Sequence, residues 1–395
     1  MQQSSAPTAA RLEFLDLFRG AFILIMVEGH TLRALLDPAI QQTASFQFHE
    51  LIHNLTGPAF LFASGASFVY STQPHWESYR RWSPKLRRRL LRWLGVLAAG
   101  YGLQLTYRSL WHTLRDSTPE QFAFLVGLNI LQCICLSLFL LQVVAMTFRD
   151  WRRFFWVAVL VTVAIGLATP FAWNAGSRWP VWLGSLVSGR TRSFFPLLPY
   201  AGFSFAGAAW GYLHALSRKQ DNERQFLIRN TGLWGLLSVA SVALSFLPLP
   251  VIYSDFWYTS PLFLFLRSGI LGMIVTGLRL LDPSPLLGTP RAALPAREPG
   301  RGLRLLAVAG RESLTIYVVH LLVLYGSAFN PDTNLVKLLG TKQSLGGALL
   351  ILAILTSAMV VLGVWWDSWK RARDRRVQGV KWLLVVYLAF ALLAG

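Results

Sequence analysis

The sequence has few charged residues and almost no cysteine. Only 14% of its 395 residues are Asp, Glu, Lys or Arg, whereas about a quarter is usual for a soluble domain. Its two cysteines, Cys133 and Cys135, are too few for a disulfide framework or a four-cysteine zinc site. Gly and Pro occur without a period, which excludes a collagen-like chain. With 54% hydrophobic residues, the composition excludes a disordered chain and indicates a membrane protein.

Long apolar runs recur along almost the whole chain. A hydrocarbon layer about 30 Å thick requires roughly 20 apolar residues of helix. We expect spans at about residues 14–34, 50–72, 90–110, 122–147, 154–173, 194–216, 229–248, 260–281, 303–327, 346–366 and 379–394. The fold class that follows is an all-α polytopic membrane protein. It is a single bundle of about eleven transmembrane helices, or ten if the short last run is not a span. No cleavage signal precedes the first run, so we expect that run to be retained as a helix.

The basic residues alternate between the two sides of the bundle. Most of the 37 Lys and Arg lie in the loops after spans two, four, six, eight and ten, and few lie in the loops between. Because Lys and Arg resist translocation, this pattern predicts a cytoplasmic N-terminus. The expected partner is therefore a lipid bilayer and not a nucleic acid, which requires positive charge on one face of a soluble domain.

No loop is long enough to fold as a separate soluble domain. We expect one domain over residues 1–395, with a disordered tail at 1–10. A Pro-rich cytoplasmic linker is expected at 282–302, within the bundle. The small residues of Gly207-x3-Gly211 predict a close contact between two helices.

Ionisable residues inside a span are costly unless they are paired or line a wet cavity, so each is a functional candidate. The first span carries Asp16, Arg19 and His30. Eleven residues return a helix almost to the same face, so Arg19 and His30 share one stripe roughly 16 Å long. Asp16 and Arg19 can pair three residues apart. Alternatively, these two merely neutralise each other at the membrane interface.

The start of the second run matches the zinc-protease pattern H-E-x-x-H. His49 and His53, four apart on a helix, could both bind zinc, with Glu50 as general base. The third ligand would come from a Leu-Asp-Gly segment, and the nearest match is Leu281-Asp282-Pro283. The predicted topology places Asp282 across the membrane from His49. We therefore disfavour an intramembrane metalloprotease and expect no metal.

Further polar residues are expected at one depth in the outer half of the bundle. They are Glu28, Asn54, Arg267 and His320. A single histidine in a bundle is commonly a hydrogen-bonded packing residue, but several such groups at one level predict a substrate cavity.

Several segments carry a resemblance to a known family. They are Arg11-x4-Asp16-x2-Arg19-Gly20-x9-His30, the Gly57 to Gly65 segment, Leu131-Gln132, the Phe195 to Tyr200 segment and the Gly310 to His320 segment. Over residues 11 to about 330 the chain resembles the transmembrane acyltransferase superfamily. It is most similar to bacterial proteins that resemble the catalytic domain of heparan-alpha-glucosaminide N-acetyltransferase. The acyltransferase three family, which modifies glycans, is a more distant cousin.

The resemblance implies an acyltransferase that uses acetyl-coenzyme A, or another acyl-coenzyme A, from the cytoplasm. The acceptor would be a carbohydrate or glycolipid on the other side of a bacterial inner membrane. In the glycan-modifying cousins the residues at the positions of Arg19 and His30 are essential, and an Arg-x2-Arg pair matches Arg89 and Arg92. Heparan acetyltransferases carry Asn at the position of His30, and their essential histidine lies between the first two spans. His49 and His53 are therefore the other candidates for the base.

The expected chemistry needs a base, cations and an oxyanion donor. A neutral imidazole suits the base, and His30 is the first choice. Arg87, Arg88, Arg89 and Arg92 could hold the coenzyme A phosphates, although the positive-inside rule also explains most of this cluster. Arg19 or Arg267 could stabilise the oxyanion. The rival from another class is a transporter or flippase without acyl transfer. A second copy of the chain, in a homodimer, is a further candidate partner.

Overall fold

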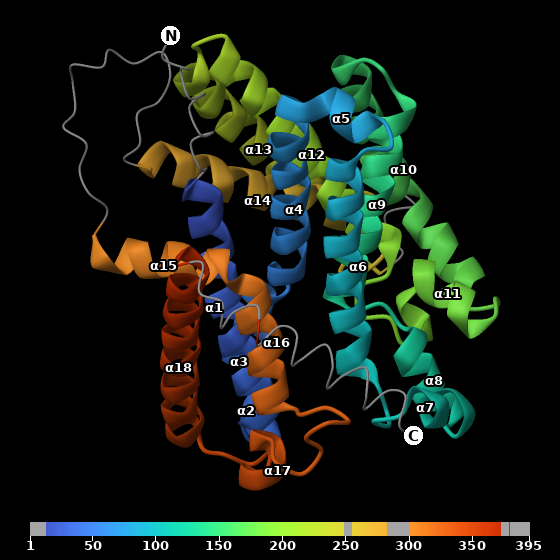
Figure 1. Ribbon diagram of the computed structural model, residues 1–395, viewed down its shortest axis with the longest axis vertical. Helices are drawn as coiled ribbons and strands as arrows, with labels where there is room; N and C mark the ends of the chain where they lie inside the picture. Colours follow the sequence, from blue (N-terminus) through green and yellow to red (C-terminus); the bar gives the residue numbers. More distant parts are fainter. Residues whose placement is uncertain (1–12, 249–254, 283–299, 373–378, 380–395) are drawn as a thin grey trace.

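The computed structural model describes residues 13–248, 255–282 and 300–372, and residue 379 (Figure 1). Every regular element in these residues is a helix, as the apolar runs predict. The predicted tail at 1–10, most of the linker at 282–302 and the last predicted span lie outside the described residues. Each earlier run contains a long helix or a bent pair of helices.

The long helices form the bundle, and most of the shorter helices lie toward its two ends (Figure 1). The long ones are α1 (Glu13–Leu35), α4 (Thr56–Thr72), α6 (Pro84–Gln104), α9 (Ile130–Thr147), α10 (Trp151–Gly176), α12 (Leu197–Lys219), α13 (Glu223–Ser245), α14 (Pro261–Leu281) and α18 (Leu345–Arg371). The bent pair is α15 (Arg301–Arg311) and α16 (Ser313–Leu324). The short ones are α2 (Pro38–Gln41), α3 (Ala44–His53), α5 (Trp76–Arg80), α7 (Leu110–Arg115), α8 (Pro119–Val126), α11 (Val181–Val187) and α17 (Leu335–Leu339).

Three predicted spans are interrupted. Residues 50–53 end the separate helix α3, so the second span begins only at Thr56. Residues 122–126 belong to α8, which a capping box between Thr118 and Gln121 starts. The ninth run bends by 78° between α15 and α16. Apolar residues such as Leu51 and Leu125 lie beside the first two breaks, so a hydropathy window runs across them.

Several helices are suited to lipid contact. Five of them, α9, α10, α13, α14 and α18, are long and apolar enough to cross a membrane, and the bent pair α15 and α16 makes a sixth. Large apolar side chains such as Leu160, Val239 and Ile354 point outward from these helices. Water would make that exposure costly, whereas lipid does not. The chain is therefore an integral multi-pass membrane protein.

The bundle interior is built on close contacts between backbones. A Cβ added at Gly65 of α4 would lie 1.8 Å from the Ser204 carbonyl oxygen, and one at Gly207 of α12 would lie 2.0 Å from that of Phe62. A Cβ at Gly211 would lie 3.0 Å from Ala66 Cα. Small residues therefore let α4 and α12 approach closely, which confirms the predicted role of Gly207 and Gly211.

Helix α15 crosses α1 through a second glycine contact. A Cβ at Gly20 would lie 2.0 Å from the Leu306 carbonyl oxygen, and one at Gly310 would lie 1.8 Å from that of Asp16. The 78° bend that follows α15 lets α16 run along the bundle instead. Ion pairs then tie the bend to α18, where Arg311 meets Asp367 at 3.0 Å.

Consecutive loops meet at opposite ends of the bundle. At the end that carries α5 and α13 (Figure 1), Trp76 Nε1 donates to the Arg149 carbonyl oxygen at 3.1 Å. At the end that carries α2, α7 and α17, Asp37 N donates to the Gln343 carbonyl oxygen at 3.0 Å. We name these the basic end and the cavity end. The arginine-rich loops after spans two and four therefore lie together at the basic end.

Candidate active site

A cavity of about 1350 Å³ is lined largely by residues of the cavity end. Helices α1, α3, α6, α9 and α16 contribute to its wall, as does the start of α12. Aromatic rings and side-chain amides share this wall, among them Phe46, Phe124, Phe195, Tyr200, Tyr317, Gln41, Gln47, Asn54, Asn129 and Gln132. Sites for one small molecule commonly measure about 300–1000 Å³. The volume is therefore sufficient for two substrates at once.

His30 of α1 lines this cavity and bonds to His320 of α16. His30 Nδ1 lies 2.9 Å from His320 Nε2, and the two rings stack with an angle of 15° between their planes. His320 is fully buried, and its Nδ1 lies 2.8 Å from the Ile316 carbonyl oxygen. The Tyr325 hydroxyl donates to the His30 carbonyl oxygen at 3.1 Å.

These contacts determine which nitrogens carry hydrogen. A carbonyl oxygen only accepts, so His320 Nδ1 must donate to Ile316. Neutral His320 then accepts at Nε2, and His30 Nδ1 is the donor. The remaining nitrogen, His30 Nε2, carries a lone pair. An imidazole held this way can take a proton from a group bound in the cavity.

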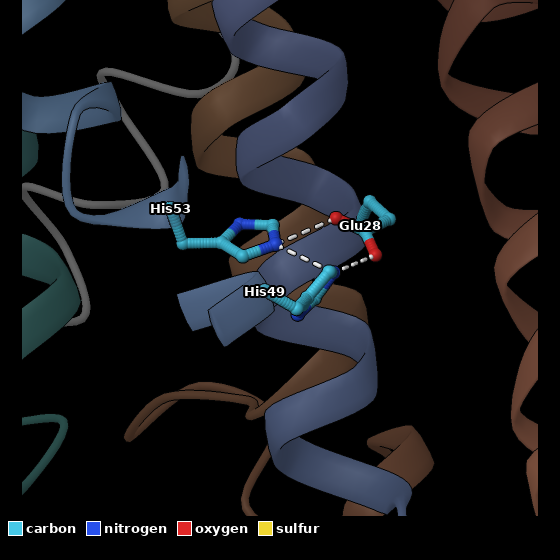
Figure 2. Close-up of side chains that lie close together, drawn as sticks. All are labelled: Glu28, His49 and His53. Carbon is cyan, nitrogen blue, oxygen red and sulfur yellow. Dashed lines mark hydrogen bonds and ion pairs between the residues drawn. The ribbon is translucent and has the colours of Figure 1, made fainter. Parts of the chain in front are cut away.

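A second cluster joins α1 to α3. His49 Nε2 lies 2.6 Å from Glu28 Oε1, and His53 Nε2 lies 2.8 Å from Glu28 Oε2. The two Nε2 atoms are 2.9 Å apart. Figure 2 shows the three side chains pointing toward one another across the two helices. His49 and His53 can both face α1 because residues four apart lie on one face of a helix.

The remaining residue of the H-E-x-x-H pattern points elsewhere. Glu50 forms an ion pair with Arg33 of α1. Asp282, the third ligand that a protease would need, pairs instead with Arg279 at 3.6 Å, next to Glu223 at the start of α13 and hence at the basic end. Glu28 therefore occupies the position beside the histidines that the protease pattern assigns to a distant Asp.

Asp16 and Arg19 form the expected pair on α1. Arg19 Nη1 lies 3.8 Å from Asp16 Oδ1, and Arg19 also donates to Ser67 Oγ of α4. Asp16 is buried, while about a quarter of the Arg19 side chain is exposed. Eleven residues separate Arg19 from His30, which places them about 16 Å apart along one face of α1.

The arginines of α6 differ in their surroundings. Arg89 is buried, donates to Thr72 at 2.9 Å and to Gln142 at 3.1 Å, and lies 3.4 Å from the ring centroid of Tyr79. Arg88 and Arg92 are exposed. The guanidinium of Arg89 therefore joins α4, α6 and α9, whereas its two neighbours are accessible to a ligand.

Of the predicted cavity residues, Asn54 lines the cavity and Arg267 lies behind its wall. Asn54 is exposed and lines the cavity. Arg267 of α14 is buried, with its guanidinium 3.8 Å from the ring centroid of Phe263. Phe263 in turn contacts Tyr200 of the cavity wall, with ring centroids 6.3 Å apart. In the described part of the chain no carboxylate pairs with Arg267. Its guanidinium therefore provides a positive charge behind the cavity wall.

One buried network of hydrogen-bonded side chains was not predicted from the sequence. The Tyr70 hydroxyl lies 2.5 Å from His214 Nδ1, and His214 Nε2 lies 2.9 Å from Glu223. Arg279 donates to the same carboxylate at 2.7 Å. His214 lies within a predicted span, so the rule that selected His30 and His320 also applies to it. This hydrogen-bond network links α4, α12, α13 and α14 at the basic end.

Comparison with known proteins identifies one family. A family model described as heparan-alpha-glucosaminide N-acetyltransferase, catalytic, matches residues 11–246. The comparison with curated proteins yields no match. The matched residues run from the start of α1 to the end of α13, so they include His30, His49 and His53 but not His320.

Proposed function

The chain belongs to the family of heparan-alpha-glucosaminide N-acetyltransferase catalytic domains, and we propose that it transfers an acetyl group from acetyl-coenzyme A to a carbohydrate acceptor. Because the chain belongs to this family, it is a membrane acetyltransferase. The observation that carries the finer proposal is the His30 and His320 pair at the wall of a cavity large enough for both substrates.

The proposed reaction begins with the acceptor bound beside His30. His30 Nε2 takes the proton from the acceptor hydroxyl or amine, which attacks the thioester carbonyl carbon. The tetrahedral oxyanion that forms then collapses, the bond from carbon to sulfur breaks, and coenzyme A leaves as a thiolate. The proton on His30 passes to that sulfur, so atoms and charge balance. His320 orients His30 and stabilises its protonated ring, as the partner of a catalytic base does.

The cavity wall supports a carbohydrate or glycolipid acceptor. Sugars present apolar faces of C–H groups and a rim of hydroxyls. Aromatic rings such as Phe195 and Tyr200 can cover the apolar faces, while amides such as Asn54 and Gln132 can bond to the hydroxyls. A lipid-linked sugar would keep its tail in the bilayer and place its head in the cavity.

The acyl donor is proposed to approach from the basic end. Its phosphates suit the exposed guanidinium groups of Arg88 and Arg92, and Arg89 would hold the helix that presents them. For the oxyanion, Arg267 is favoured over Arg19 because its charge lies behind Tyr200 and no carboxylate among the described residues pairs with it. Arg19 lies about 16 Å from His30 along α1.

The test is turnover by purified protein. Radiolabelled acetyl-coenzyme A offered with a panel of amino sugars, polysaccharides and lipid-linked sugars should give labelled acceptor and free thiol. A second measurement should detect binding of acetyl-coenzyme A without an acceptor. If the protein neither binds acetyl-coenzyme A nor cleaves its thioester with any acceptor, the proposed enzyme activity is rejected. That result would favour a transporter, since polar intramembrane groups also mark transport pathways.

For topology, we propose about eleven spans with a cytoplasmic N-terminus in a bacterial inner membrane. Single cysteines at two exposed arginines make a matched test, Arg81→Cys at the basic end and Arg115→Cys at the cavity end. The native Cys133 and Cys135 are buried and should label poorly. In intact cells an impermeant thiol reagent should modify the Arg115→Cys variant and spare the Arg81→Cys variant. The reverse result would invert the proposed topology.

A further inference from the structure

Three possible metal ligands converge between α1 and α3. Glu28, His49 and His53 each direct one ligand atom to a common point, and these atoms lie within 4.8 Å of one another (Figure 2). The set contains two imidazoles and one carboxylate. Zinc commonly binds such a set in proteins and keeps its fourth position open to water or substrate.

Hydrogen bonds alone do not satisfy all the polar atoms of Glu28, His49 and His53. A carboxylate only accepts, so His49 Nε2 and His53 Nε2 would each need a hydrogen to bond to Glu28. Two N–H groups would then face each other with nitrogens 2.9 Å apart. A cation between the three groups removes this conflict, because both nitrogens and the carboxylate then direct lone pairs at it.

The spacing is close to what a zinc ion requires. Bonds of about 2.0–2.1 Å in a tetrahedral arrangement place two ligand atoms about 3.3 Å apart. Here the two Nε2 atoms are 2.9 Å apart, and each lies 2.6 or 2.8 Å from a different carboxylate oxygen of Glu28. Small side-chain rotations that lengthen each of these distances by roughly half an ångström would therefore open the cluster to tetrahedral spacing.

The surroundings hold the ligands in place. A Cβ at Gly29 would lie 2.1 Å from His53 Nδ1, so only glycine lets that ring lie against α1. The ring of Phe46 contacts His49, with centroids 5.4 Å apart. The ion pair between Arg33 and Glu50 joins the same two helices and leaves Glu50 turned away from the cluster. His53 also lines the large cavity, which gives an ion a polar approach.

We propose that Glu28, His49 and His53 form a binding site for one Zn²⁺ ion that ties α3 to α1 at the edge of the cavity. This departs from the expectation of no metal, because the third ligand comes from α1 and not from Asp282. The site does not depend on the proposed acetyl transfer. Its ligand set resembles that of zinc proteases, but the pairing of Glu50 with Arg33 removes the general base that a protease needs.

The test is the zinc content and affinity of the full chain. The protein is purified in detergent without a histidine tag, incubated with Zn²⁺ and dialysed, and its zinc is measured by elemental analysis. We expect about one zinc per chain, as for a three-ligand site. Co²⁺ in place of Zn²⁺ should give the strong visible absorption of a four-coordinate ion. Glu28→Gln, His49→Ala and His53→Ala should each weaken zinc binding by about 100-fold or more, since even outer partners of a metal site contribute 10–100-fold.

His112→Ala is the matched control for the removal of a histidine side chain. His112→Ala removes an exposed histidine that pairs only with the nearby Asp116 among the described residues, and its zinc content should equal that of the original chain. If an alanine variant is not recovered in folded form, Glu28→Gln decides the matter, because it keeps the side-chain size and removes only the charge. Zinc below about a tenth per chain, or unchanged zinc in Glu28→Gln, would overturn the proposal. Equal loss in His112→Ala would do the same.

Discussion

Replacing His30 with alanine is expected to lower the rate of acetyl transfer by about 10²–10⁴-fold, the usual contribution of a general base. Binding of acetyl-coenzyme A should be nearly unchanged, because His30 lies near the cavity end and the proposed phosphate contacts lie on α6. The rate is measured with saturating donor and acceptor, and donor binding is measured separately. A loss confined to the KM for the acceptor would instead assign His30 to substrate binding.

His320 should act through His30, as a positioning residue. Its Nε2 accepts from His30 Nδ1, so His320→Phe removes the acceptor while filling similar space. We expect kcat to fall substantially with little change in KM. His320→Gln supplies a carbonyl oxygen that can accept the same hydrogen bond and should restore part of the rate.

The matched control for both substitutions is His112→Ala, which changes an exposed histidine outside the cavity. Its activity should equal that of the original protein. Full activity in His30→Ala would reject His30 as the base. Full activity in His320→Phe would show that His320 serves packing only.

Adding a single methyl group at Gly310 is expected to destabilise the whole bundle. In Gly310→Ala the new Cβ would lie 1.8 Å from the Asp16 carbonyl oxygen and 2.8 Å from the Gly20 nitrogen. Both are backbone atoms of α1, so a change of rotamer cannot relieve the clash and the two helices must separate. Overpacking of this kind typically costs about 1–3 kcal/mol and sometimes more. The measurement is the thermal midpoint in detergent, followed by size-exclusion chromatography.

Gly302→Ala on the same helix is the matched control. Nothing lies within 4 Å of a Cβ built at Gly302, so that substitution should leave stability unchanged. It could even add up to about 1 kcal/mol, since alanine favours helix over glycine. If both variants melt at the same temperature, the close crossing of α1 and α15 does not hold the bundle together.

The helical membrane class could be predicted from the sequence, whereas several helix boundaries could not. In lipid each segment must satisfy its own backbone hydrogen bonds, so a long apolar run already implies a helix. The break between His53 and Thr56 is a short backbone turn with apolar residues on both sides, so a hydropathy window runs across it. The bend at Glu312 depends on contacts with α1 and α18, which lie far away in the sequence.

Candidate residues could likewise be found more readily than their partners. The cost of polar groups in lipid identified Glu28, Asn54, Arg267 and His320 as one set at a similar depth, and identified His30 separately on the first span. The structure divides that set. His30 bonds to His320, which is 290 residues away, Glu28 turns to His49 and His53, and Arg267 lies over Phe263. Which groups meet depends on how each helix is rotated about its axis, and packing sets that rotation.

Arg89 illustrates the same division. Its place in a cluster of arginines predicts phosphate binding together with Arg88 and Arg92, and that role remains a prediction for all three. Tertiary packing separates them, since Arg89 is buried against Tyr79 and bonded to Thr72. Spacing along α6 could not reveal this, because burial depends on α4 and α9.

The sequence by itself determined the helical membrane class, the alternation of basic loops and, through its motifs, the resemblance that the family match confirms. Hydropathy, charge and helical period belong to single segments, so one chain contains enough information for them. Only the tertiary structure decided that His30 meets His320 and that Glu28 completes the cluster of His49 and His53. These partnerships require helices to approach at particular rotations, and contacts such as the one between Gly20 and Gly310 determine those rotations.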